Sequence, residues 1–175
     1  MLLLSLSAGL ALVPLIGLTV AQPWHVEGRS MEPALADGSV LLVDSLGPRL
    51  TGYDRGDIVI LPVPRWANYG APLLVKRIVA VAGDHVTIQD GVVRVNGAVP
   101  SEPYLPAGTV TPVASNGLDL VVPPGDVFIL GDHRGNSFDS KAFGPVPAAT
   151  LLGRAWFAIS PWGSMELPGA AAGAG

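Results

Sequence analysis

The amino-acid sequence predicts a mainly β, antiparallel domain that follows one N-terminal transmembrane helix. Of the 175 residues 49% are apolar, and residues 1–24 carry no charged side chain. The 22 Gly and 17 Pro interrupt helices too often for a helical bundle. After residue 24 the apolar residues recur mostly with a period of two, which is typical of strands.

The predicted anchor is the N-terminal segment, residues 1–23. Residues 2–21 are nearly all apolar, and a helix of this length, at about 1.5 Å per residue, spans about 30 Å, the thickness of a hydrocarbon core. A cleaved secretory signal peptide is the alternative, but the apolar run is long and no basic residue precedes it. Since charge is absent, the positive-inside rule gives no orientation for the anchor.

Short strands are expected throughout the second unit, residues 24–162. Asp90-Gly91 lies between two alternating segments and predicts a two-residue hairpin turn. Residues 100–117, rich in Pro, Ser and Gly, are expected to form a variable surface excursion, and residues 163–175 a flexible C-terminal tail. The expected strands are 39–43, 57–63, 73–82, 85–89, 92–95, 127–130 and 151–159.

Composition and spacing exclude several kinds of site. A net charge of -4 provides no basic surface for nucleic acid. The chain has no Cys, and its three His are far apart without H-E-x-x-H spacing, so we expect neither a metal site nor a bound cofactor. A triad of Ser30, His133 and Asp132 can be written down, but no G-x-S-x-G motif supports it.

Lys76 is the first candidate for chemistry. It is one of two Lys in the chain and lies in the apolar segment LLVKRIVAV, residues 73–81. Removing an ammonium group from water lowers its pKa, which makes the neutral amine available as a general base. The alternative is an ordinary strand Lys on the solvent face of a sheet.

Two further segments contain candidate residues. In VEGRSMEPALADG, residues 26–38, Ser30 precedes a Pro-containing turn, although most loop serines only cap turns. The second segment, GDHRGNSFDSKAFGPV, residues 131–146, is a charged, Gly-rich loop of the kind that holds ion pairs.

Together these segments resemble, in order, the motifs of bacterial type I signal peptidases, which are membrane-anchored Ser/Lys proteases. The resemblance extends from about residue 24 to residue 162, and VNG (95–97) and EPY (102–104) are also similar to the family. GRSMEPAL (28–35) resembles the nucleophile box, RGDIV (55–59) the next box, KRIVAVAGD (76–84) the lysine box, and residues 131–146 the final Asp/Ser box.

The resemblance implies a role for each site residue. Ser30 is the nucleophile, neutral Lys76 the general base, and Ser137 the serine that hydrogen-bonds the amine. Asp139, paired with Lys141 or Arg77, is expected to form a supporting layer of salt bridges.

The resemblance also implies an oxyanion hole, to which the Ser30 backbone N–H contributes one donor. In some family members a side-chain hydroxyl two residues before the nucleophile is the second donor. Gly28 occupies that position here, so the second donor of the Gly28 region stays unidentified. His133 and Lys141, where Asn and Arg are commoner in the family, are smaller departures.

The implied function is removal of signal peptides from exported preproteins at A-x-A-like sites. The substrate is expected to bind extended, as an added strand, with small residues at the cleavage site. Membrane lipid is the other expected partner, because the chain is implied to be single-pass in the cell membrane with its catalytic domain on the extracytoplasmic side.

Three alternatives compete with this function. A related Ser/Lys maturation peptidase, of the pilin or organelle type, differs only in its substrate. A self-cleaving SOS-repressor-type peptidase would need an N-terminal DNA-binding domain where this chain has an apolar segment. A non-catalytic, membrane-tethered β domain is the third alternative, and Ser30, Lys76 and Ser137 argue against it.

Overall fold

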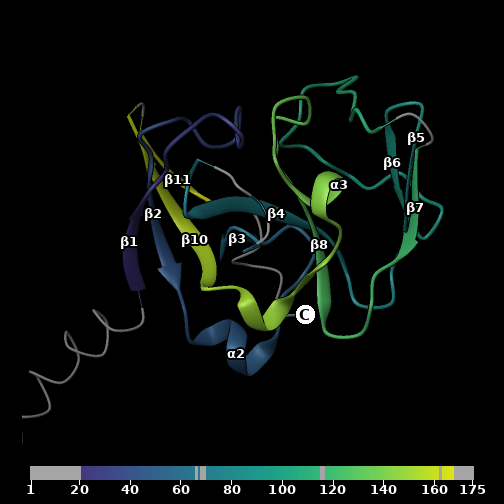
Figure 1. The fold of residues 1–175 in the computed structure, drawn as a ribbon. Coiled ribbons are helices and arrows are strands. Elements are labelled where there is room, and N and C mark those ends of the chain that lie inside the picture. The colour runs from purple at the N-terminus through teal and green to yellow at the C-terminus, as the bar shows by residue number, and fades with distance from the viewer. Residues whose placement is uncertain (1–20, 66, 68–69, 115–116, 162, 168–175) are drawn as a thin grey trace, which may run out of the picture.

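The computed structural model describes residues 21–65, 67, 70–114, 117–161 and 163–167. The predicted anchor, apart from its last three residues, and residues 168–175 of the predicted tail lie outside these ranges. Among the described residues, no helix is long and apolar enough to cross a bilayer. The chain forms two antiparallel sheets that lie beside each other (Figure 1), which confirms the expectation of a mainly β, antiparallel domain.

The larger sheet has the strand order β1-β2-β10-β3-β4-β8-β9, with β11 paired to β10. Its strands are β1 (Ala21–His25), β2 (Val40–Asp44), β3 (Ile58–Pro62), β4 (Leu73–Val81), β8 (Asp126–Leu130), β9 (Val146–Pro147), β10 (Gly153–Ser160) and β11 (Gly163–Glu166). Two short α-helices, α2 (Gly47–Thr51) and α3 (Ser140–Phe143), and a 3-10 turn, η1 (Ala148–Thr150), lie in the connections.

The smaller sheet has the order β6-β5-β7, from β5 (His85–Gln89), β6 (Val92–Val95) and β7 (Leu118–Val121). Asp90 and Gly91 form the expected turn between β5 and β6, with φ of 50° and 76°. Both residues of such a turn need positive φ, which Gly adopts freely and Asp tolerates. Strand β7 is absent from the strands expected from the sequence, because its residues lie directly beside the Pro- and Gly-rich segment.

Two boundaries differ from those expected. Residues 21–23, assigned to the anchor, begin β1, where Ala21 lies opposite Asp44 of β2. Residues 163–166, assigned to a flexible tail, form β11 and pair with β10, and Leu167 is buried in the core. In both cases pairing with another strand, β2 for residues 21–23 and the preceding β10 for residues 163–166, orders a segment whose own composition suggests an anchor or a tail.

The segment 100–117 is also more than a surface excursion. Its described residues contain no strand, but Thr111 is buried and its N–H donates to the Gly91 carbonyl over 2.8 Å. Glu102 and Tyr104 contact charged side chains beneath the segment. We call residues 100–117 the excursion below.

Strand β4 connects the two halves of the core. Ile78 packs in a cluster with β3 and β8, whereas Val79 and Ala80 pack with residues of the small sheet. A bulge in the pairing with β8 lies between Ile78 and Ala80, which lets β4 turn from one core to the other. Both Lys76 and Arg77 on this strand are buried, so their charged groups need partners within the protein.

Candidate active site

Ser30 lies in a compact turn between β1 and β2, residues 28–38, which we call the Ser30 turn. Met31 and Leu35 are buried and joined by a hydrogen bond from the Leu35 N–H to the Met31 carbonyl, 2.8 Å. Gly28 begins the turn at φ +94°, a conformation that a side chain would strain. The buried side chains of Met31 and Leu35 therefore hold the turn in place, while Ser30 beside them stays half-exposed.

Lys76 reaches this turn from β4. Its Nζ lies 2.8 Å from Ser30 Oγ and 2.7 Å from the Val75 carbonyl oxygen. Only 2% of Lys76 is exposed, and loss of hydration lowers its pKa from 10.5 to about 8. Asp139 opposes this change, and Lys141 adds to it. The arrangement places an amine with a depressed pKa in direct contact with a serine hydroxyl, which can transfer its proton to the amine.

A groove of about 340 Å³ opens over this contact. Residues 24–31 form one wall, residues 71–76 the other, and Ile60 and Asn136 also line the groove. Strand β1 is the terminal strand of its sheet, and β8 pairs with β4 only at Arg77–Val81. Each wall thus presents a strand edge with backbone groups available to an extended peptide.

Ser137 does not make the expected hydrogen bond to Lys76. Its Oγ is buried and has no hydrogen-bond partner among the described residues. Instead it packs against Gly131: a Cβ added at Gly131 would lie 2.2 Å from Ser137 Oγ and 2.6 Å from the Ser30 carbonyl oxygen. Ser137 is therefore adjacent to the Ser30 backbone, and its hydroxyl is free to accept or donate in this arrangement.

Of the ion pairs expected near the site, that of Asp139 with Lys141 forms, whereas Arg77 has an unexpected partner. Lys141 Nζ lies 2.8 Å from both carboxylate oxygens of Asp139, as anticipated. Arg77 pairs with Asp132, at 2.9 and 2.7 Å, and not with Asp139. Asp139 instead caps α3, accepting from the Lys141 N–H, and also accepts from the Gly131 N–H.

The Ser30 N–H is available as a backbone donor. Within the described chain, the Ser30 N–H makes no hydrogen bond, so it can serve an oxyanion. The Gly28 N–H is occupied by Asp37 Oδ1, 2.8 Å away, and is not available as the second donor. No atom lies within 4 Å of the position that a Cβ at Gly28 would occupy, so open space surrounds this residue.

The Ser30-His133-Asp132 triad does not form. The His133 ring is exposed, with Nδ1 3.2 Å from the Arg29 carbonyl oxygen, and the Asp132 carboxylate is engaged by Arg77. The backbone of His133 is what contacts the site, because its N–H donates to the Ser30 carbonyl, 3.0 Å. Among the described residues, no group of three or more His, Cys, Asp or Glu is arranged to hold a metal ion.

Sequence reasoning missed two contacts of the site, the pairing of Asp132 with Arg77 and the close approach of Gly131 to Ser30. Both begin the final motif, and a Cβ at Gly131 would lie 2.6 Å from the Ser30 carbonyl oxygen. The buried Arg77, next to Lys76 in an apolar strand, was the available signal that a carboxylate must lie nearby.

Comparison with known proteins agrees with these motifs. The family model "Signal peptidase, peptidase S26" matches residues 1–162. Signal peptidase IB of Staphylococcus aureus is 28% identical, over 94% of this chain and 91% of its own length. Thylakoidal processing peptidase 1 of Arabidopsis thaliana is 33% identical over 81% of this chain and 43% of its own length. A crystal structure of a signal peptidase I from Enterococcus faecalis V583 has 27% identity and a TM-score of 0.45, covering 58% of this chain and 94% of the other.

The family match covers most of the chain, and it includes the Ser30 turn and β4. The resemblance read from the sequence motifs is thereby confirmed. The chain belongs to the signal peptidase family, peptidase S26, and is a serine hydrolase of the signal peptidase I type.

Proposed function

We propose that this protein removes signal peptides from exported preproteins by a Ser30-Lys76 dyad. The observation that carries this proposal is the 2.8 Å contact between Lys76 Nζ and Ser30 Oγ, with Lys76 buried. A serine hydroxyl is a weak nucleophile without a base, and the buried amine is the group placed to take its proton. The related proteins named signal peptidase IB support the substrate class.

In the proposed reaction, neutral Lys76 accepts the Ser30 hydroxyl proton while Ser30 Oγ bonds to the scissile carbonyl carbon. The carbonyl oxygen becomes an oxyanion that the Ser30 N–H stabilises. The Lys76 ammonium then gives its proton to the leaving amine as the peptide C–N bond breaks. Water, deprotonated by Lys76, attacks the acyl carbon, and the Lys76 ammonium returns the proton to Ser30 Oγ as the ester bond breaks.

The substrate is proposed to bind extended in the groove, between the edges of β1 and β4. The groove is lined by Trp24, Val26, Met31, Leu73 and Val75, which favours small apolar side chains at its two inward-facing positions. An A-x-A-like sequence presents Ala at such alternating positions.

Membrane attachment is proposed to come from residues 1–20, whose apolar sequence is long enough for a transmembrane helix. In this arrangement the chain is single-pass in the cell membrane and the β domain is extracytoplasmic. Since β1 begins at Ala21 and the Ser30 turn follows it, the dyad stays close to the point where the anchor ends.

The test is cleavage of a preprotein with Ala at positions -3 and -1, using the full chain in detergent and N-terminal sequencing of the product. Ser30→Ala and Lys76→Met should each lower kcat at least about 10³-fold, because each removes a reacting group. Ser101→Ala, an exposed serine outside the groove, is the matched control and should cleave normally. Turnover near the wild-type rate by Lys76→Met would contradict the dyad.

A related maturation peptidase is the second candidate, because the Arabidopsis thylakoidal processing peptidase is 33% identical over the matched region. The two candidates share the chemistry and differ in substrate. A panel of secretory preproteins and pilin or thylakoid-type precursors distinguishes them by relative kcat/KM.

A further inference from the structure

Arg77, next to the proposed base, is enclosed on all sides. Its Nε and Nη2 donate to Asp132, and its Nη1 donates to the Gly56 carbonyl over 2.9 Å. The centroid of the Tyr104 ring lies 3.7 Å from the guanidinium carbon, so the ring covers one face of the group. Arg77 is fully buried, so Tyr104, a residue of the excursion, excludes water from a charged pair one residue from Lys76.

Tyr104 is tied to a second buried ion pair. Its hydroxyl donates to Glu102 Oε1 over 2.7 Å, and burial together with Glu102 raises the Tyr104 pKa above its usual range. Glu102 pairs in turn with both terminal nitrogens of Arg134. Only 3% of Arg134 is exposed, so it depends on Glu102 for charge compensation.

Arg134 connects the excursion to the backbone around Ser30. Its Nε donates to the Gly131 carbonyl over 3.2 Å, and its Nη1 also donates to Thr111 Oγ1. Gly131 is the residue that packs directly against the Ser30 carbonyl and the Ser137 side chain. The hydrogen bond from Arg134 to the Gly131 carbonyl therefore helps to set the distance between Ser30 and Ser137.

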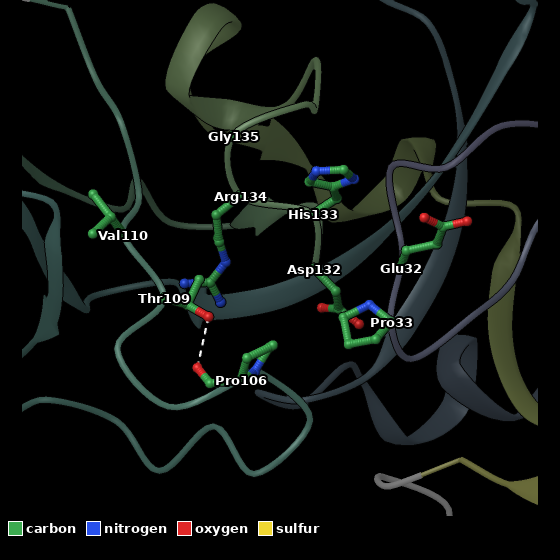
Figure 2. Close-up of a pocket in the computed structure, with 9 residues that line it drawn as sticks. All are labelled: Glu32, Pro33, Pro106, Thr109, Val110, Asp132, His133, Arg134 and Gly135. Carbon is green, nitrogen blue, oxygen red and sulfur yellow. Dashed lines mark hydrogen bonds between the residues drawn. The ribbon is translucent and has the colours of Figure 1, made fainter.

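Figure 2 shows a pocket of about 380 Å³ beside Asp132 and Arg134, the two residues of this network that line it. Pro106, Thr109 and Val110 of the excursion form one side, and Glu32 and Pro33 of the Ser30 turn form the other. Asp132 and Arg134 lie between them. Open space separates the excursion from the Ser30 turn here, and Arg134 between them donates to Thr111 of the excursion and to the Gly131 carbonyl.

We propose that Glu102, Tyr104 and Arg134 are positioning residues for the proposed peptidase reaction. The excursion seals the Arg77-Asp132 pair through Tyr104 and holds Gly131 through Glu102 and Arg134. The contact with Arg77 fixes the position of the neighbouring Lys76 on β4. The contact with Gly131 fixes the position of the Ser30 backbone, which packs against it. The proposal rests on the proposed function, since it assigns these residues to the geometry of the Ser30-Lys76 contact.

The first experiment measures kcat and KM for an A-x-A precursor with full-length Glu102→Gln, Arg134→Met and Tyr104→Leu. Each should lower kcat about tenfold or more with KM changed less than about threefold, because misplacement of reacting groups reduces rate more than binding. Tyr104→Phe keeps the ring on Arg77 and should restore most of the rate lost in Tyr104→Leu. Assays run well below the melting temperature of each variant, so the folded fraction is equal.

Two matched controls belong to the same experiment. Ser101→Ala changes an exposed neighbour of Glu102, and Arg94→Met removes an exposed Arg from β6 that has no ion pair among the described residues. Both should retain wild-type kcat. If wild type itself does not cleave, the proposed function fails; if wild type cleaves and all three variants keep kcat within about twofold, the positioning role is overturned.

A second measurement tests whether Glu102 and Arg134 act on the site through Gly131. In a Ser137→Ala background, Glu102→Gln should lower kcat by a smaller factor than in wild type, because both changes act on the same contact. If Glu102→Gln lowered kcat by the same factor in both backgrounds, the effect would not pass through Gly131 and this part of the proposal would be overturned. If Tyr104→Leu does not fold, Glu102→Gln, which conserves volume, carries the test.

Discussion

At the scale of single residues, the environment of Lys76 decides the chemistry that is available. The side chain is buried and faces a hydroxyl and a carbonyl, and neither group can neutralise an ammonium. Desolvation is therefore the largest influence, and it lowers the Lys76 pKa to about 8. A residue that an ordinary strand would expose as a cation becomes usable as a base near neutral pH.

The pH dependence of cleavage should report this pKa. Because only the neutral amine accepts the Ser30 proton, kcat/KM should rise about tenfold per unit below the pKa and level off above about pH 8. Initial rates across about pH 6–10 on an A-x-A peptide measure the profile. A rising limb centred near about pH 10, the value of an exposed Lys, would contradict the depressed pKa.

The same pKa predicts a stability effect of defined sign. Between pH 8 and 10.5 the unfolded chain holds a proton that folded Lys76 has released, so the free energy of unfolding rises with pH over this window. The full difference is about 3 kcal/mol. Urea unfolding at about pH 7.5 and about pH 10.5 should show this rise in wild type, and Lys76→Met should lack that component. Equal pH dependence in the two proteins would be evidence against a depressed pKa.

Gly131 should be intolerant of any side chain. Gly131→Ala places a Cβ 2.6 Å from the Ser30 carbonyl oxygen and 2.2 Å from Ser137 Oγ, and the backbone oxygen cannot move without displacing Ser30. We expect a loss of kcat of about 10²-fold, from misplacement of the nucleophile. Gly135→Ala, in the same segment with open space around its Cβ position, is the control and should be near wild type. Wild-type kcat in Gly131→Ala would refute the close approach.

At the scale of elements, strand β4 and the segment before α3 meet to form the site. Strand alternation places Lys76 and Arg77 on opposite faces of β4, and each face is covered, Lys76 by the Ser30 turn and Arg77 by Asp132 and Tyr104. The segment 131–139 reaches both faces, because Asp132 binds Arg77 while Ser137 packs beside Ser30. Its end is fixed by Asp139, the N-cap of α3.

Asp139 should therefore contribute strongly to stability. Its carboxylate is fully buried and accepts from the Gly131 N–H, the Lys141 N–H and the Lys141 ammonium. Asp139→Ala leaves a nearly buried ammonium unpaired, and we expect a loss of about 3–5 kcal/mol in urea unfolding. Asp119→Ala, an exposed carboxylate on β7, should change stability by less than about 0.5 kcal/mol. A loss that small in Asp139→Ala would exclude this structural role.

At the scale of the whole molecule, the β domain extends from β1 to Leu167. Val26, Met31 and Leu167, from the two ends of the described chain, pack in one cluster with β2, β3 and β10. Val26 and Leu167, near the two ends of the described chain, thus belong to one core. The described cores are built from residues 24–167.

A chain that begins at Ala21 should fold without residues 1–20. We expect its melting temperature to match that of the full chain and its kcat/KM for a short soluble A-x-A peptide to remain within about threefold, since the dyad and groove are intact. It should not float with phospholipid vesicles in high salt, whereas the full chain should. Equal flotation of both proteins would show that attachment does not depend on residues 1–20.

The sequence alone determined the β character, the hairpin turn and the identity of the Ser30 and Lys76 segments, because period-two patterning, Asp-Gly and the family motifs are local signals. It did not determine that Arg77 pairs with Asp132, that Ser137 packs on Gly131, or that the excursion reaches both buried Arg side chains. Arg77 and Asp132 are 55 residues apart. From the local sequence one can predict that a buried Arg77 needs a carboxylate partner. Which carboxylate pairs with it depends on how segments distant in the sequence pack together.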